Sequence, residues 1–152
     1  MGNIIAGFRW DKEPFQVLEG MKRGLQTKIL RKSMRQGVKI LVPAVKTAAP
    51  KLTGALRVSV GALVKGKGMR VLGMVGSKTK YMRTKDGKKI QPSKYFHLVN
   101  AGTKTRTTKD GRNRGKVTAT FFLNKVWTAN KGRASQAMMT TMRTEISLQL
   151  AK

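Results

Sequence analysis

The residues that could support acid–base or metal chemistry are few in this sequence. His97 is the single histidine, six residues are acidic, and cysteine is absent. A nucleophilic triad needs a base with an orienting acid, and metal or paired-carboxylate sites need clustered ligands. The acids are scattered and His97 lies in an apolar run, so we interpret it as a structural or interface residue. We therefore expect a protein that is not an enzyme, with no catalytic residue, metal site or cofactor.

The large excess of lysine and arginine indicates what kind of partner the protein could bind. The chain has 33 of them against 6 acidic residues, a formal net charge of +27. A compact domain with this charge repels itself, and a polyanion or an acidic partner surface would offset the repulsion. Nucleic acid is the leading candidate because neutralised phosphates release counterions; the alternative is a surface charged for solubility alone. No helix-turn-helix, zinc-finger or base-stacking pattern is present, so we expect only non-specific backbone contact.

The basic residues are concentrated in two loops, at about residues 78–94 and 104–116. Each loop contains Thr-Lys-Asp-Gly, at 84–87 and 108–111, and Asp-Gly favours a tight turn because glycine tolerates positive φ. Almost no apolar residue and only two acids accompany these charges, so neither core packing nor internal ion pairs explains them. We predict projecting hairpins or flexible loops. The side chains that we expect to face DNA or an acidic partner are Arg83, Lys85, Lys88, Lys89, Arg106, Arg112 and Arg114.

A long amphipathic helix is predicted from about Phe15 to Ala49. Its apolar residues recur at helical spacing on one side. The opposite side carries Lys28, Arg31, Lys32, Arg35 and Lys39. Pro43 should kink this helix, and Asp11 is a candidate for its N-terminal cap. Residues 3–10, which precede it, could be a strand or an arm.

Alternating residues over 55–76 predict a β-hairpin with Gly66-Lys67-Gly68 as its turn and Met69–Val75 as its return strand. That strand is apolar on both faces, so we expect the long helix to cover one face and a neighbouring subunit the other. We expect the Tyr95–Thr103 segment to join this sheet and its contacts between subunits. The predicted interface residues are Leu72, Met74, Tyr95, Phe96, Gly102 and Thr103.

A final helix is predicted over about Ala134–Leu150. One buried stripe should contain Ala134, Met138, Met142, Ile146 and Leu150. The whole chain then forms one domain, residues 1–152, of the α+β class. In it a small antiparallel sheet packs against the long N-terminal helix, with a C-terminal helix and projecting basic hairpin loops. We expect no signal peptide and no membrane segment, and a soluble protein made in a reducing cytoplasm.

Three sequence blocks resemble, in order, the tail-component family of long-tailed bacteriophages, whose members are also described as tail-completion or head–tail joining proteins. Ala48–Val60 is similar to the family's Ala-Pro, Thr-Gly-x-Leu-Arg-x-Ser-Ile block, and Tyr95–Thr103 to its Tyr, aromatic, Glu-x-Gly-Thr segment. Phe121-Phe122-Leu123 resembles its Pro-Phe-Leu block. The similarity spans about residues 38–150. Asn100 stands where the family usually has glutamate, the proline is replaced by Thr120 or Phe121, and the basic loops are longer.

The resemblance implies a structural virion protein that forms a ring in the neck or tail, between head connector and tail, around the DNA channel. Its expected partners are further copies in a hexameric or dodecameric ring, other neck and tail proteins, and DNA contacted non-specifically. It would be assembled in the host cytoplasm. Two alternatives stay open: a nucleic-acid-binding protein that acts by charge alone, and a different neck component such as an adaptor or stopper. A neck protein should assemble without DNA, whereas a charge-only binder should depend on a polyanion.

Overall fold

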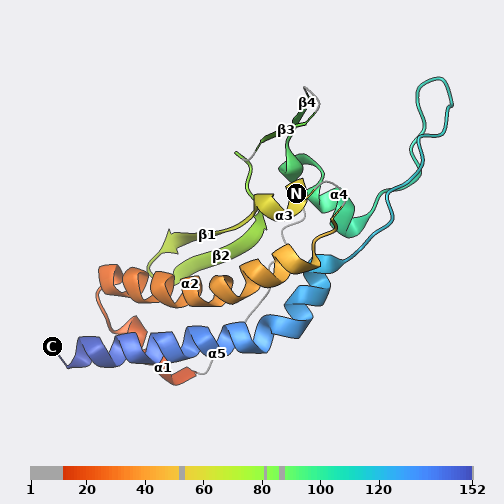
Figure 1. The fold of residues 1–152 in the computed structure, drawn as a ribbon. Coiled ribbons are helices and arrows are strands. Elements are labelled where there is room, and N and C mark those ends of the chain that lie inside the picture. The colour runs from red at the N-terminus through yellow and green to blue at the C-terminus, as the bar shows by residue number, and fades with distance from the viewer. Residues whose placement is uncertain (1–11, 52–53, 81, 86–87, 152) are drawn as a thin grey trace.

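The computed structural model describes residues 12–51, 54–80, 82–85 and 88–151 (Figure 1). Its helices are α1 (Lys12–Glu19), α2 (Arg23–Ala48), α3 (Ala55–Ser59), a 3₁₀ turn η1 (Pro92–Lys94), α4 (Phe96–Ala101) and α5 (Phe122–Leu150). Its strands are β1 (Val60–Lys67), β2 (Arg70–Ser77), β3 (Arg83–Lys85) and β4 (Lys88–Ile90). The predicted α+β class, with a small antiparallel sheet on a long N-terminal helix and a further C-terminal helix, is confirmed.

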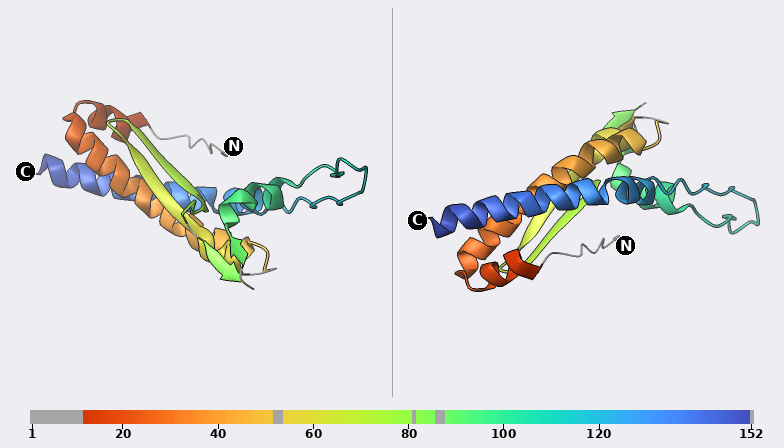
Figure 2. Two further views of the ribbon diagram at one scale, coloured as in Figure 1. Left: turned by 90° about the horizontal axis from the view of Figure 1, so that it is seen from above. Right: turned by 90° about the horizontal axis from the view of Figure 1, so that it is seen from below.

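Helix α2 lies between the β1–β2 hairpin on one side and α5 on the other, so the body has three layers (Figures 1 and 2). The predicted apolar side of α2 explains this placement, because Ile29, Leu30, Val38, Leu41 and Val45 are all buried. The hairpin approaches α2 closely at Gly73, where an added Cβ would lie 2.6 Å from Met34 Cγ. A larger residue in β2 would push these two layers apart.

The single helix predicted over 15–49 is interrupted between Glu19 and Arg23. Gly20 lies at this break, and the Gln26 side chain stabilises it by donating to the carbonyls of Leu18 (3.1 Å) and Met21 (3.0 Å). Carbonyls at a helix end lack hydrogen-bond partners within the helix, so the Gln26 amide supplies donors to the end of α1. Asp11 and residues 3–10 lie outside the described residues.

The hairpin differs from its prediction at both ends. Residues 55–59, predicted as strand, form α3, because Ala55-Leu56-Arg57 are good helix formers and the Arg57 side chain bonds back to the carbonyl of Ala49 (2.8 Å). The predicted turn at 66–68 is displaced. Lys67 pairs with Arg70, so Gly68 and Met69 make the turn, with Gly68 at φ +58°.

Two later segments were also predicted wrongly. Tyr95–Thr103 does not extend the sheet, since most of it forms α4. The last helix, α5, begins at Phe122 and not near Ala134. Its stripe of Ala134, Met138, Met142 and Ile146 is buried as predicted, but Leu150 is 69% exposed. The core cluster at this end of α5 includes Met142 and Ile146, which pack with Leu18, Ile29 and Leu30, but it does not include Leu150. No helix in the described ranges is long and apolar enough to cross a membrane.

Candidate nucleic-acid interface

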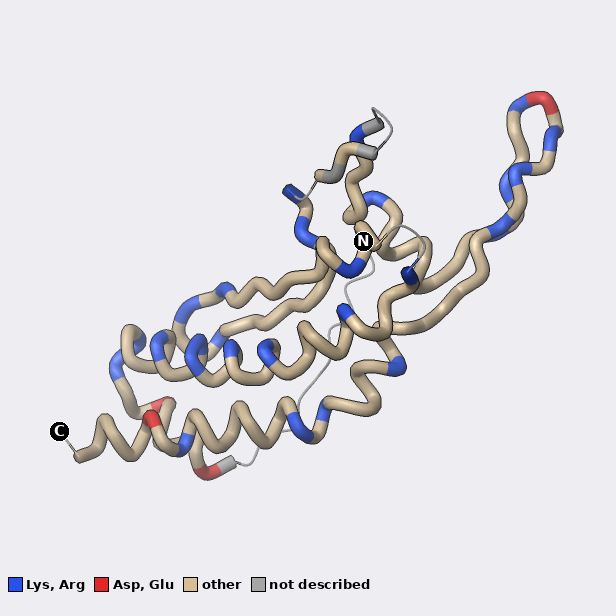
Figure 3. The backbone as a smooth tube through the Cα atoms, in the orientation of Figure 1, with Lys and Arg blue, Asp and Glu red and all other residues tan. Residues whose placement is uncertain are grey.

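A strongly basic part of the described chain is a long arm, residues 103–119, between α4 and α5. It leaves the body where these helices meet and extends well beyond them (Figures 1 and 2). Its basic residues Lys104, Arg106, Lys109, Arg112, Arg114 and Lys116 are all exposed, and Asp110 is its single acid (Figure 3). The predicted projecting loop at 104–116 is therefore present, and core packing does not explain its composition.

The arm is a narrow ribbon held by its own backbone. Near the base, Thr103 donates to the carbonyl of Val117 (2.9 Å), and further out Arg106 donates to the carbonyl of Gly115 (3.0 Å). Thr107 and Asn113 form an antiparallel bridge. At the tip, Gly111 donates to the carbonyl of Thr108 (3.0 Å), which closes the predicted Asp-Gly turn. These bonds keep the two sides together, so the six cations are carried on one ordered element.

Both ends of the arm are fixed to the core. Phe96 at the start of α4 and Phe122 at the start of α5 are buried and meet edge to face, with ring centroids 5.3 Å apart. Thr120 donates to the carbonyl of Val99 through both its N–H (3.2 Å) and its hydroxyl (2.8 Å). An edge-to-face aromatic pair is worth about 1 kcal/mol beyond its buried area. The direction of the arm is thus set by the packing of α4 against α5.

Asn100 has a role that its identity alone did not reveal. It is buried at the end of α4, and its Oδ1 accepts from the N–H of Leu123 in the first turn of α5 (3.0 Å). Phe121, the residue before that turn, supplies no side-chain cap and has φ +48°. Asn100 therefore caps α5 from another helix and holds the arm's base. The sequence pointed to Asn100 only through its position, because it stands where the resembled family usually has glutamate.

The second predicted basic loop forms a small hairpin. β3 pairs antiparallel with β4, with Arg83 opposite Ile90 and Lys85 opposite Lys88. Lys89 is exposed, whereas the side chains of Arg83, Lys85 and Lys88 lie outside what the structure describes. This hairpin and the arm are separate projections from the same end of the body (Figure 1).

Two of the five residues on the basic side of α2 have partners within the fold. Arg31 donates to the carbonyl of Gly66 in β1 (2.9 Å), and Lys32 pairs with Glu145 of α5 at 2.5 Å. Lys28, Arg35 and Lys39 remain exposed. The basic side of α2 contains no acid of its own, and Glu145 of α5 supplies the carboxylate that pairs with Lys32. The arm, with six exposed cations, therefore offers more free positive charge than the basic side of α2, where three remain exposed without a partner among the described residues.

The predicted interface residues fall into two groups. Leu72 is 42% exposed and Met74 half-buried, both on the outer face of the hairpin. Leu63, opposite Met74, is 53% exposed on the same face. The other predicted residues lie around α4. Tyr95 and Phe96 pack into the core, Gly102 begins the arm at φ +76°, and the Thr103 hydroxyl accepts from Val117. Among the described residues, the outer face of β2 is thus partly exposed.

The described residues contain no group of three or more His, Cys, Asp or Glu able to hold a metal ion. His97 is exposed on α4.

Comparison with known proteins gives one match. A family model described as "Bacteriophage HK97-gp10, putative tail-component" matches residues 16–102, more than half of the chain. No curated protein and no solved structure matches. The matched region runs from α1 through the hairpin to the end of α4. It includes the first of the three blocks that carried the resemblance and all but the last residue of the second. The chain belongs to the HK97-gp10-like tail-component family of bacteriophages.

Proposed function

We propose that this tail component is a ring-forming neck or tail-completion subunit that joins the head connector to the tail around the DNA channel. The observation that carries the proposal is the arm, an ordered ribbon with six exposed cations and one acid. Such an element adds nothing to the core, and repulsion between its charges raises the free energy of bringing subunits together. DNA in the lumen of a ring would turn this cost into attraction, because each neutralised phosphate releases counterions.

The hairpin supports the ring. Its outer face exposes Leu63 and Leu72 beside Met74, and among the described residues β1 and β2 form a two-stranded sheet with open edges. Exposed apolar residues that lie together on a sheet are typical of contacts between subunits. A closed ring needs a heterologous interface, in which this face meets a different face of the next copy.

The DNA contact can be tested by the salt dependence of binding. The arm variant replaces Arg106, Lys109, Arg112 and Arg114 with glutamine. The control variant makes the same change at four exposed lysines of the body, Lys22, Lys46, Lys125 and Lys131. Binding to a duplex of about 20 base pairs is measured by fluorescence anisotropy between about 50 and 200 mM salt. The slope of log K against log salt should fall by about 0.9 for each lost contact, or about 3–4 for the arm variant.

The control variant should change the slope much less, because its charges lie on the body and not on the arm. Equal slopes for the two variants would mean that DNA responds to total charge alone, which is the behaviour of the charge-only alternative. An image reconstruction of the phage neck tests the position directly. Rings with arms directed into the channel are expected. Arms that point into solvent, away from both the channel and adjoining rings, would refute the proposal.

A further inference from the structure

Strand β1 has an open edge along α2. In the described residues its sheet contains two strands, and β2 pairs with one edge of β1 over Val60–Lys67. The other edge runs beside α2, where Arg31 donates to the carbonyl of Gly66 (2.9 Å). An open edge presents unpaired N–H and C=O groups and is a template for another strand.

The register indicates which backbone groups are free. Lys67 and Arg70 close a two-residue turn, and in an antiparallel ladder hydrogen-bonded and non-bonded pairs then alternate. Gly66, Val64 and Ala62 fall in the non-bonded pairs, so their N–H and C=O groups point away from β2. The bond from Arg31 to the Gly66 carbonyl agrees with this assignment. Arg31 occupies that carbonyl, which leaves the edge open at Ala62 and Val64.

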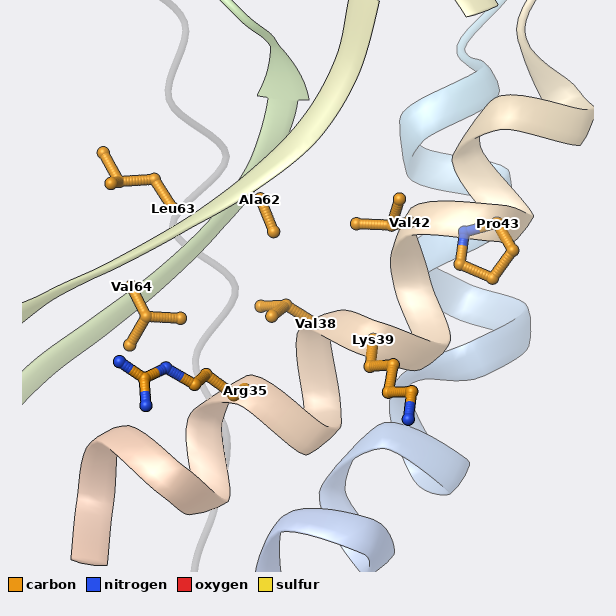
Figure 4. Close-up of a pocket in the computed structure, with 8 residues that line it drawn as sticks. All are labelled: Arg35, Val38, Lys39, Val42, Pro43, Ala62, Leu63 and Val64. Atoms are coloured by element: carbon orange, nitrogen blue, oxygen red, sulfur yellow. The ribbon is translucent and has the colours of Figure 1, made fainter. Parts of the chain in front are cut away.

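A groove of about 550 Å³ lies between this edge and α2. Val38, Val42 and Pro43 of α2 form one wall, and Ala62, Leu63 and Val64 form the other (Figure 4). Figure 4 shows Val38 and Val42 directed toward Ala62, with the Arg35 guanidinium close to Val64. Lys39 leaves α2 one turn after Arg35 and completes the lining. The groove therefore combines open strand backbone, an aliphatic wall and two cations.

The charge of the groove identifies its partner. The only ion pair between described residues joins Lys32 to Glu145. Neither Arg35 nor Lys39 therefore has a carboxylate partner among them. A second copy is a poor source, because the whole chain has six acids against 33 basic residues. We propose that the groove binds an extended, acidic segment of a different polypeptide, which adds to β1 as a third strand. Its backbone would pair with Ala62 and Val64, its apolar side chains would contact Val38 and Val42, and its carboxylates would meet Arg35 and Lys39.

A designed peptide tests this inference. The probe is a fluorescent dodecapeptide that repeats Val-Val-Glu-Glu, so that each face of the added strand carries both residue types. The matched control peptide has proline at every valine. Both have the same charge, but the control peptide lacks an N–H at each proline, and proline disfavours strand pairing. The valine peptide should bind about tenfold more tightly. On binding it should slow hydrogen exchange at the Ala62 and Val64 amides by about tenfold or more.

Two variants locate the site. Arg35→Gln with Lys39→Gln should weaken binding of the valine peptide by about tenfold, whereas Lys109→Gln with Arg112→Gln, the same charge change on the arm, should weaken it by about twofold or less. Val64→Pro should also weaken binding while leaving the ladder to β2 intact, because the Val64 N–H points outward.

Three results would overturn the inference: equal affinity for the two peptides, unchanged exchange at Ala62 and Val64, or equal losses in the groove and arm variants. A change in oligomeric state of the Val64→Pro variant without any peptide would assign the groove to a second copy instead. The inference rests on the proposed function only in taking the partner to be another virion protein. Peptide binding can therefore fail while rings form, and rings can be absent while the peptide binds.

Discussion

Gly37 is expected to respond to substitution by alanine in the opposite sense from another helical glycine, Gly132. Gly37 is buried in α2 where this helix meets α5. A Cβ added there would lie 2.2 Å from Met138 Sδ and 2.6 Å from its Cγ. Gly132 lies in α5, and a Cβ added to it would meet nothing within 4 Å. The two substitutions add the same methyl group to a long helix, so their difference isolates the packing between α2 and α5.

The expected magnitudes follow from two opposing effects. Alanine is favoured over glycine inside a helix by about 0.5–1 kcal/mol, which is the full effect expected for Gly132→Ala. At position 37 the methyl group must displace Met138, which is 1% exposed. Overpacking of this kind costs about 1–3 kcal/mol. Because methionine is flexible, we expect a value in the middle of that range and a net loss of about 1 kcal/mol for Gly37→Ala.

The free energy of unfolding is measured by urea denaturation and the thermal midpoint by heating, both followed by far-UV circular dichroism. Gly37→Ala should lower the thermal midpoint by about 2–4 °C and Gly132→Ala should raise it by a similar or smaller amount. Shortening Met138 to alanine should cost less in the Gly37→Ala background than in the wild type, because the new methyl group fills part of the space. If Gly37→Ala is as stable as Gly132→Ala and shows no coupling to Met138, the close approach of the helices is refuted.

Two further substitutions test the hairpin face and the ion pair. Leu72→Lys should leave the unfolding free energy within about 0.5 kcal/mol of the wild-type value, since the side chain is already partly exposed. It should nevertheless prevent ring assembly, which is measured by sedimentation velocity. Normal assembly would exclude this face from the interface. Lys32→Met should cost more stability than Glu145→Gln, about 3 against 1 kcal/mol, because the first leaves a buried carboxylate without a partner whereas Lys32 can be solvated. Urea denaturation of both variants measures the difference, and equal costs would contradict the burial of Glu145.

The sequence was sufficient to predict features that depend on local periodicity or composition. The buried residues of α2 and the stripe from Ala134 to Ile146 were predictable because apolar side chains recur at helical spacing. The arm was predictable because a run of cations with Asp-Gly and almost no apolar residue cannot pack into a core. These signals are local, so they hold without knowledge of the tertiary contacts.

The errors occurred where residue types are compatible with two structures. Residues 55–59 alternate like a strand, yet the bond from Arg57 to Ala49 favours a helical turn. The last helix was predicted to begin near Ala134, but it begins at Phe122, where Asn100 caps it. Short apolar runs cannot be assigned by periodicity alone, and distant contacts decide them. The groove beside β1 was not predictable for the same reason, since it depends on which strand edge faces α2.

The distribution of charge within the fold favours a neck subunit over a protein that acts by charge alone. A charge-only binder needs many cations but no particular placement of them, and flexible tails would serve it as well. Here some cations hold the layers together, as Arg31 does with Gly66 and Lys32 with Glu145. Others lie on a hydrogen-bonded arm whose base is fixed by Phe96 and Phe122. A further pair lines the groove beside an open strand edge. Ordered, separated basic surfaces suit the subunit that we propose, which contacts DNA at one site and acidic protein at another.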